Sequence, residues 1–151
     1  MTKYETAAID KAVRILESRL SYHQQPPISS PEASKQLCFL KLGDKPDEHF
    51  AVAFLTNRHQ LLSFETLFRG TVDGASVHPR VVVRRALELN AAAVILSHNH
   101  PSGHPTPSQA DQRITTRLKE ALALVDVRVL DHLIVGSRLE KTVSLAEKGM
   151  L

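Results

Sequence analysis

Two short apolar runs constrain the fold more than any other feature of this sequence. Residues His49–Leu55 and Ala92–Ser97 are apolar at nearly every position, and each run is too short for a helix of ordinary length. Runs of this kind are typical of strands that are covered on both faces. We therefore expect two buried strands, with the strand from His49 at the centre of the sheet.

Helix and strand signals alternate around these two runs. Apolar residues recur every three or four positions in residues 8–20 and 79–90, as in amphipathic helices. Further helices are predicted over 30–43, where Ser30 and Pro31 form a start signal, and over 108–124. Further strands are predicted over 61–69 and 127–135. This order predicts a mixed α/β fold in which the strand from His49 forms a hairpin with the next one.

The chain has the size and composition of one compact domain. It contains 151 residues, of which 42% are hydrophobic. A proline-rich stretch from Gln24 to Ser29 cannot continue a helix. We therefore predict an N-terminal helical arm over residues 1–25, a linker with a short helix over 26–44, and the main domain over 45–151.

Charge and cysteine content limit the classes of function. The 19 Lys and Arg residues exceed the 16 Asp and Glu residues by only three, so nucleic-acid binding is not indicated. We interpret Arg80, Arg84 and Arg85 as a solvated helix face. A single cysteine, Cys38, excludes an internal disulfide, and we assign it to helix packing. No signal peptide and no apolar run of about 18 residues is visible. A cytoplasmic location without a membrane partner is expected.

The segment from His98 to Asp111 carries the strongest chemical signal. Residues two apart in a strand point to the same side, so His98 and His100 can offer both imidazoles to one point. A loop rich in proline then leads to Asp111 in the first turn of the next helix. Two histidines and one carboxylate leave one position open, which is typical of a catalytic zinc site. We predict one Zn²⁺ per chain, bound by His98, His100 and Asp111.

Two alternative interpretations apply to parts of this segment. Ser108-x-x-Asp111 is also an ordinary helix-capping signal, in which the serine and the acid bind free amide groups. A lone His-x-His pair is common by chance, and either ring can be a satisfied polar group at a strand end. The combination of both patterns in one fixed order is much less common and favours the metal site.

The arrangement resembles a known motif and a known family. His98-x-His100 is followed by the seven residues from Pro101 to Pro107 and then by Ser108-x-x-Asp111, which looks like the JAMM (MPN+) metalloprotease motif. A wider resemblance to the bacterial RadC family covers about residues 45–149. The segments that carry it are Phe68–Thr71, Val77–Arg80, Leu89–Ala93, His98–Gly103 and Leu130–His132.

The resemblance implies a single JAMM/MPN-like domain with a curved mixed sheet flanked by helices, an architecture like that of cytidine deaminases. Full-length members of the family also carry an N-terminal helix-hairpin-helix region associated with DNA binding. Residues 1–44 are too short for that region and lack its glycine hairpins. We therefore expect a short form that resembles the catalytic domain alone.

The family resemblance also implies catalytic residues and a reaction. Glu48 matches the upstream glutamate that acts as general base, and Glu65 is its rival. If the strand from His49 runs antiparallel to the strand from Ala92, Glu48 lies beside the two histidines. Ser108 or the metal itself is expected to stabilise the oxyanion. The implied reaction is the hydrolysis of an amide bond, of the peptide or isopeptide kind, in a peptide or protein substrate.

Several interpretations stay open at the level of sequence. His104 is expected to be an exposed loop residue rather than a ligand. Asp131 and His132 either orient a metal ligand or only satisfy buried backbone groups. The alternative functions are a nucleic-acid-interacting protein associated with DNA repair and a zinc-binding interaction module without catalysis. The sequence gives no oligomeric state.

Overall fold

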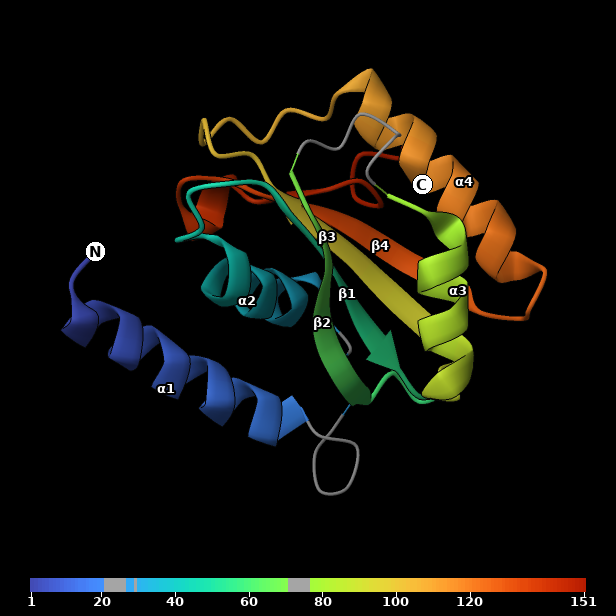
Figure 1. The fold of residues 1–151 in the computed structure, drawn as a ribbon, viewed down its shortest axis with the longest axis horizontal. Coiled ribbons are helices and arrows are strands. Elements are labelled where there is room, and N and C mark those ends of the chain that lie inside the picture. Colours follow the sequence, from blue (N-terminus) through green and yellow to red (C-terminus); the bar gives the residue numbers. More distant parts are fainter. Residues whose placement is uncertain (21–26, 29, 71–76) are drawn as a thin grey trace.

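A five-stranded mixed sheet forms the centre of the protein, and four helices surround it (Figure 1). The structure, a computed structural model, describes residues 1–20, 27–28, 30–70 and 77–151. The strands are β1 (His49–Leu55), β2 (Leu61–Arg69), β3 (Ala93–Asn99), β4 (Arg128–Val135) and β5 (Val143–Ser144). The helices are α1 (Lys3–Leu20), α2 (Pro31–Leu42), α3 (Pro79–Glu88) and α4 (Gln109–Ala123), with a short 3-10 helix at Leu139–Lys141. The predicted mixed α/β class is confirmed.

The strand order places β3, which carries the candidate ligand His98, at the centre of the sheet. The order is β2-β1-β3-β4-β5, and all neighbours are antiparallel except β3 and β4. The parallel pair needs a crossover connection, which α4 provides. The antiparallel pairing of β1 with β2 confirms the predicted hairpin. Phe50 of β1 pairs with His98 of β3, which confirms the predicted antiparallel arrangement of these two strands.

The sheet is covered on both faces, as the two apolar runs predicted. All seven residues of β1 are buried, and all seven residues of β3 are buried too. Alternate residues of β1 pack on opposite sides. Phe50, Val52 and Phe54 pack in one apolar cluster with residues of α3 and α4. Ala51, Ala53 and Leu55 pack in another with residues of α2.

The helix α2 joins the sheet in this second cluster. Ser30 caps it, because its Oγ accepts a hydrogen bond from the backbone N–H of Ala33 (3.3 Å), and Gly43 follows its end. Figure 1 shows α1 on the outer side of α2, and Lys41 joins the two helices by an ion pair with Glu17 (2.7 Å). The proline-rich stretch 24–29 lies largely outside the described residues. The division of the chain at residues 25 and 44 stays a prediction.

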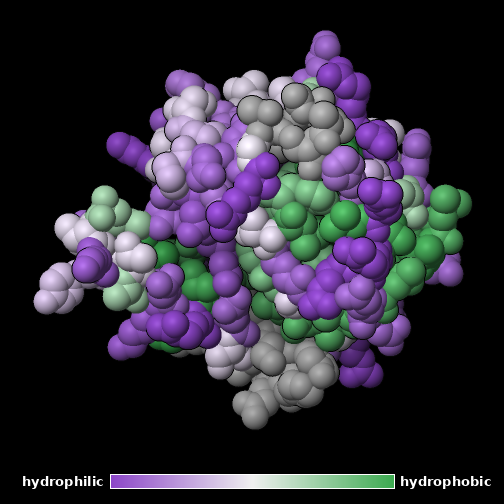
Figure 2. All heavy atoms as spheres, viewed as in Figure 1, coloured by the Kyte–Doolittle hydropathy of each residue, from purple (hydrophilic) through white to green (hydrophobic). Residues whose placement is uncertain are grey.

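The first apolar cluster reaches the molecular surface. Figure 2 shows apolar side chains exposed between the sheet and α3. The partly buried residues of this cluster include Leu62, Leu67, Phe68 and Val83. Among the helices of the described segments, none combines the length and the apolar character needed to cross a membrane.

Candidate metal site

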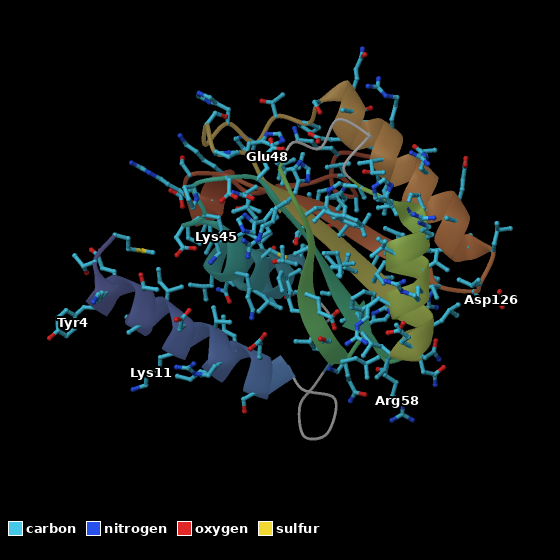
Figure 3. The ribbon with its side chains drawn as sticks, viewed as in Figure 1. Tyr4, Lys11, Lys45, Glu48, Arg58 and Asp126 are labelled. Carbon is cyan, nitrogen blue, oxygen red and sulfur yellow. The ribbon has the colours of Figure 1, made fainter. Side chains whose placement is uncertain are left out.

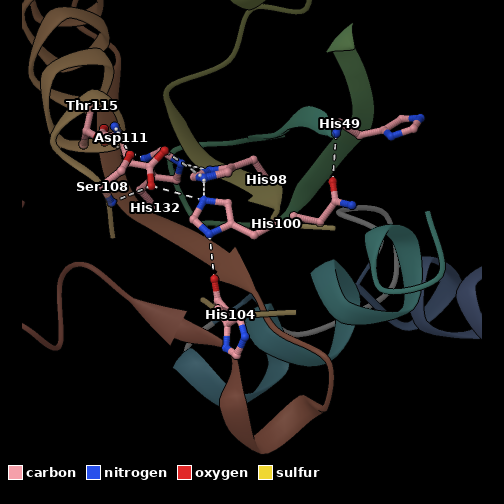
Figure 4. A network of polar contacts seen from close by, with 9 residues as sticks. His49, His98, His100, His104, Ser108, Asp111, Thr115 and His132 are labelled. Atoms are coloured by element: carbon pink, nitrogen blue, oxygen red, sulfur yellow. Dashed lines mark hydrogen bonds and ion pairs between the residues drawn. The ribbon is translucent and has the colours of Figure 1, made fainter. Parts of the chain in front are cut away.

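The three predicted metal ligands lie together at one end of the sheet (Figure 4). His98 is on β3, His100 follows its last residue, and Asp111 lies in the first turn of α4. His98 Nε2 lies 3.0 Å from Asp111 Oδ1, and His100 Nε2 lies 3.2 Å from Asp111 Oδ2. The two Nε2 atoms are 3.0 Å apart. The alternation of β3 and the start of α4 therefore bring all three side chains to one point.

These distances suit a shared metal ion. Ligand atoms that surround zinc at about 2.0–2.1 Å in a tetrahedron lie roughly 3.3 Å from one another. The three ligand atoms here lie within 4.8 Å of one another, and the side chains of His98 and Asp111 are almost fully buried. Neutral imidazole nitrogens and a carboxylate oxygen are donors that zinc accepts. The residues present therefore fit a zinc ion.

A buried chain of hydrogen bonds determines the tautomer of His98. The hydroxyl of Thr115 donates to the backbone carbonyl of Asp111 (2.6 Å), so its oxygen accepts from His132 Nδ1 (2.5 Å). The pKa of His132 is lowered by its burial and by repulsion from His98, so its ring is neutral and its Nε2 is an acceptor. His98 Nδ1 therefore donates to His132 Nε2 (2.8 Å). In neutral His98, the lone pair on Nε2 consequently faces Asp111.

The same reasoning applies to His100. Its Nδ1 lies 2.8 Å from the backbone carbonyl of His104, which can only accept a hydrogen bond. The Nε2 lone pair of neutral His100 therefore also faces Asp111. Two lone pairs and a carboxylate that converge in this way repel one another unless a proton or a metal cation lies among them. The side chain of His104 is exposed, as predicted, and only its carbonyl contributes to the site.

The electrostatics of the acid and of His100 favour the charged forms. Burial acts to raise the pKa of Asp111, but hydrogen bonds, above all from His100, hold it well below its usual range. The hydrogen bond with Asp111 raises the pKa of His100, although burial opposes this shift. A metal ion therefore competes with a proton for His100, because only the neutral ring binds metal.

The capping and the metal-site interpretations of Ser108 and Asp111 hold together in the structure. Asp111 N donates to Ser108 Oγ (3.0 Å), and Ser108 N donates to Asp111 Oδ2 (2.8 Å), which completes a capping box. The cap orients the carboxylate toward the two histidines. The bond to Asp111 N uses an acceptor site on the Ser108 hydroxyl and leaves its O–H able to donate.

Glu48 and its rival Glu65 lie in different surroundings. Glu48 immediately precedes β1, two residues before the partner of His98 (Figure 3). The hydrogen bond with Asp111 is the main influence that raises the pKa of His100, and the negative charge of Glu48 also raises it. Glu65 instead binds Arg85 through both carboxylate oxygens (2.7 and 2.9 Å), and this hydrogen bonding lowers its pKa. Of the two acids, Glu48 is the one whose charge acts on His100.

Asp131 and His132 are neighbours in the sequence, but they have different partners in the structure. His132 contacts the ligand His98, as described above. Asp131 accepts hydrogen bonds from the backbone N–H groups of His132 (2.7 Å) and Ala146 (3.0 Å) and from the hydroxyl of Ser144 (2.5 Å). His132 therefore orients a candidate ligand, whereas Asp131 satisfies buried backbone groups and holds β5 on β4.

Thr115 is a residue of the site that sequence reasoning missed. It lies four residues after Asp111 and thus on the same face of α4, a spacing that marks it as a neighbour. Its partner His132 lies on β4, and the sequence alone does not indicate that the two side chains meet. The hydroxyl of Thr115 links His132 to the backbone carbonyl of Asp111 in the chain that begins at His98.

We expect Thr115→Val to weaken metal binding by 10- to 100-fold and to lower the free energy of unfolding by about 1–3 kcal/mol. The valine keeps the shape but leaves His132 Nδ1 without its acceptor. Thr116→Val is the matched control, because the exposed Thr116 hydroxyl makes the same kind of bond to the Gln112 carbonyl (3.0 Å). Metal competition with a chelator and denaturant unfolding measure both effects. Equal results for the two variants would refute the role of Thr115.

Comparison with known proteins agrees with the geometry of the site. Residues 28–150 match the family model described as RadC-like JAB domain. The chain is 53% identical to a UPF0758 protein of Vibrio cholerae over 148 residues, which cover 98% of this chain and 90% of that protein. A UPF0758 protein of Thioalkalivibrio sulfidiphilus is 59% identical over 124 residues, 82% of this chain.

The relatives differ in length. The alignments span 54% of the Thioalkalivibrio protein and 64% of a Methylibium petroleiphilum relative that is 57% identical over 145 residues. The match to the family model includes β1 to β5, α2 to α4 and all three candidate ligands. This chain belongs to the RadC-like JAB domain family.

Proposed function

We propose that this protein is a zinc-dependent hydrolase of the metallopeptidase or isopeptidase type. The observation that carries the proposal is the convergence of His98 Nε2, His100 Nε2 and the Asp111 carboxylate at 3.0–3.2 Å. In both histidines the other ring nitrogen donates to a fixed acceptor, so the converging atoms are metal-binding atoms. His98, His100 and Asp111 would hold the zinc ion.

The donor set favours a catalytic over a structural role for the ion. Structural zinc sites usually use four protein ligands from Cys or His, whereas catalytic sites use three and keep one position open. The only cysteine, Cys38, is buried in the cluster on the opposite face of the sheet. Its burial raises the pKa of its thiol to about 12, which opposes a thiolate ligand.

The residues around the site supply the other parts of a hydrolytic reaction. Zinc bound there would lower the pKa of a water ligand toward about 7 and polarise a substrate carbonyl. Glu48 accepts the proton of the attacking water and later donates it to the leaving amine. Ser108 donates its O–H to the oxygen on which negative charge develops. The capping box fixes Ser108 for this task.

Peptides and proteins are the proposed substrates, because His98, His100, Ser108 and Asp111 follow the spacing of the JAMM metalloprotease motif. The test is to incubate zinc-loaded protein with a peptide library and with isopeptide-linked peptides, and to detect new amino groups by mass spectrometry. We expect cleavage that a chelator abolishes and that added zinc restores. A protein that binds zinc at these three residues but cleaves neither class would instead be an interaction module.

A further inference from the structure

Asn99 lies between the two candidate histidine ligands in sequence but points to the other face of the sheet. Because side chains alternate along β3, Asn99 shares a face with Ser97 and Ile95. Ile95 packs on the α2 side of the sheet. Leu96 instead packs on the α4 side, with His98 next along the same face. The side chain of Asn99 is buried, since only 3% of the residue is exposed. A buried amide in this place needs polar partners.

The partners of Asn99 are the backbone groups on both sides of Glu48. Asn99 Oδ1 accepts from His49 N (2.8 Å), a bond drawn at the His49 label in Figure 4. Asn99 Nδ2 donates to the carbonyl of Asp47 (3.0 Å) and lies 3.4 Å from the carbonyl of Lys45. The donor and acceptor types of these partners fix the orientation of the amide.

These bonds immobilise both peptide groups that meet at the Cα atom of Glu48. The Asp47 carbonyl belongs to the peptide group before Glu48, and the His49 N–H belongs to the one after it. Gly70 N also donates to the Glu48 carbonyl (2.9 Å), and the His49 ring contacts the Asp47 carbonyl (3.0 Å). Fixing both peptide groups fixes the backbone angles of Glu48 and so the direction of its Cα–Cβ bond.

The direction that results is toward the candidate metal site. Glu48 precedes Phe50 by two positions, and Phe50 packs on the α4 face, where its ring stacks on that of His98 at 6.1 Å. Alternation therefore assigns the Glu48 side chain to the same face as the histidines. Asn99 holds the backbone of Glu48 from the α2 side and has no need to touch the reacting groups.

We propose that Asn99 is a positioning residue that fixes the general base Glu48 against the metal site. This proposal rests on the proposed function, because Glu48 must act on a metal-bound water for its direction to matter. A zinc ion held by His98, His100 and Asp111 would make the site sensitive to the placement of Glu48. A few tenths of an ångström at Glu48 decide whether a proton can pass within hydrogen-bonding distance.

The test is a spectroscopic double-mutant cycle that needs no substrate. Co²⁺ accepts the same nitrogen and oxygen ligands as zinc, and its visible absorption responds to the groups around its open position. Spectra are recorded for the wild-type protein, Glu48→Gln, Asn99→Ala and the double variant, each loaded with Co²⁺. We expect Asn99→Ala to change the spectrum as Glu48→Gln does, and the double variant to add nothing. Co²⁺ affinity should fall less than about 10-fold, because Asn99 bonds to no ligand side chain.

Two further variants keep the test decisive. Asn99→Asp keeps the acceptor for His49 N and loses the donor to the Asp47 carbonyl. It replaces Asn99→Ala in the double-mutant cycle if Asn99→Ala does not fold. The added charge of Asn99→Asp can also change the Co²⁺ spectrum directly. Such a direct change would persist when Asn99→Asp is combined with Glu48→Gln, whereas a change that results from the position of Glu48 would vanish in that combination. Leu61→Ala is the control for destabilisation, because Leu61 is buried at the far end of the β1–β2 hairpin. Its Co²⁺ spectrum should equal that of the wild-type protein.

The outcomes separate the two proposals. An unchanged spectrum in both Asn99 variants, together with a changed spectrum in Glu48→Gln, would overturn the role of Asn99 and leave the proposed function intact. Additive changes in the double variant would overturn it as well. Failure of the wild-type protein to bind either Co²⁺ or Zn²⁺ would overturn the proposed function and, with it, the role of Asn99.

Discussion

Asp111→Asn is expected to lower zinc affinity by more than roughly 100-fold, because loss of a group that merely supports a ligand already costs 10–100-fold. The amide has nearly the shape of the carboxylate but supplies no negative charge to the ion and only one acceptor oxygen. The same change should cost about 0.5–1 kcal/mol of helix-cap stability. Zinc content by mass spectrometry and thermal unfolding of the metal-free protein measure the two effects separately.

Ser108→Ala is the matched control, because it removes the other half of the same capping box. It should retain zinc and lose roughly 1 kcal/mol of stability. Its hydrolytic activity should fall by more than this loss of stability explains, because Ser108 also donates to the oxyanion. If Asp111→Asn keeps the full zinc affinity, the proposed site of two histidines and one aspartate is wrong, and Asp111 is only a cap.

Glu48→Gln is expected to lower the rate of peptide or isopeptide hydrolysis by roughly 10²–10⁴-fold, the usual contribution of a general base. Zinc should stay bound, because Glu48 is not among the three residues that would hold the metal ion. Rates follow from the cleaved peptides of the library experiment, and zinc content is measured on the same sample.

Glu65→Gln serves as the control for the loss of an acid near the sheet. It breaks the pair with Arg85 on the β2–α3 side and should leave the rate of hydrolysis within about twofold of the wild-type rate, because an ion pair that includes no candidate metal ligand contributes to stability and not to the reaction. A Glu65→Gln protein that loses activity while Glu48→Gln keeps it would reverse the assignment of the general base.

The ligand spacing and the fold class followed from the sequence, because both depend on local periodicities. Residues two apart in a strand share a face, which predicted that His98 and His100 act together. The apolar character of 49–55 and 92–97 predicted a sheet buried on both faces, and the structure confirms it. Ser108, followed three residues later by Asp111, predicted the start of α4 and thus the place of Asp111. Each of these signals lies within a few residues along the chain.

The residues that support the ligands depend on which distant segments adjoin. Thr115 and His132 meet because α4 packs over β4, and Asn99 reaches residues 47 and 49 because β3 pairs with β1. A one-residue slip in that register would turn every side chain of a strand to the other face. No local pattern encodes the register, since it results from packing of the whole core. The sequence by itself determined the candidate ligand residues, and only the tertiary structure decided which of their atoms converge and which hydrogen bonds orient them.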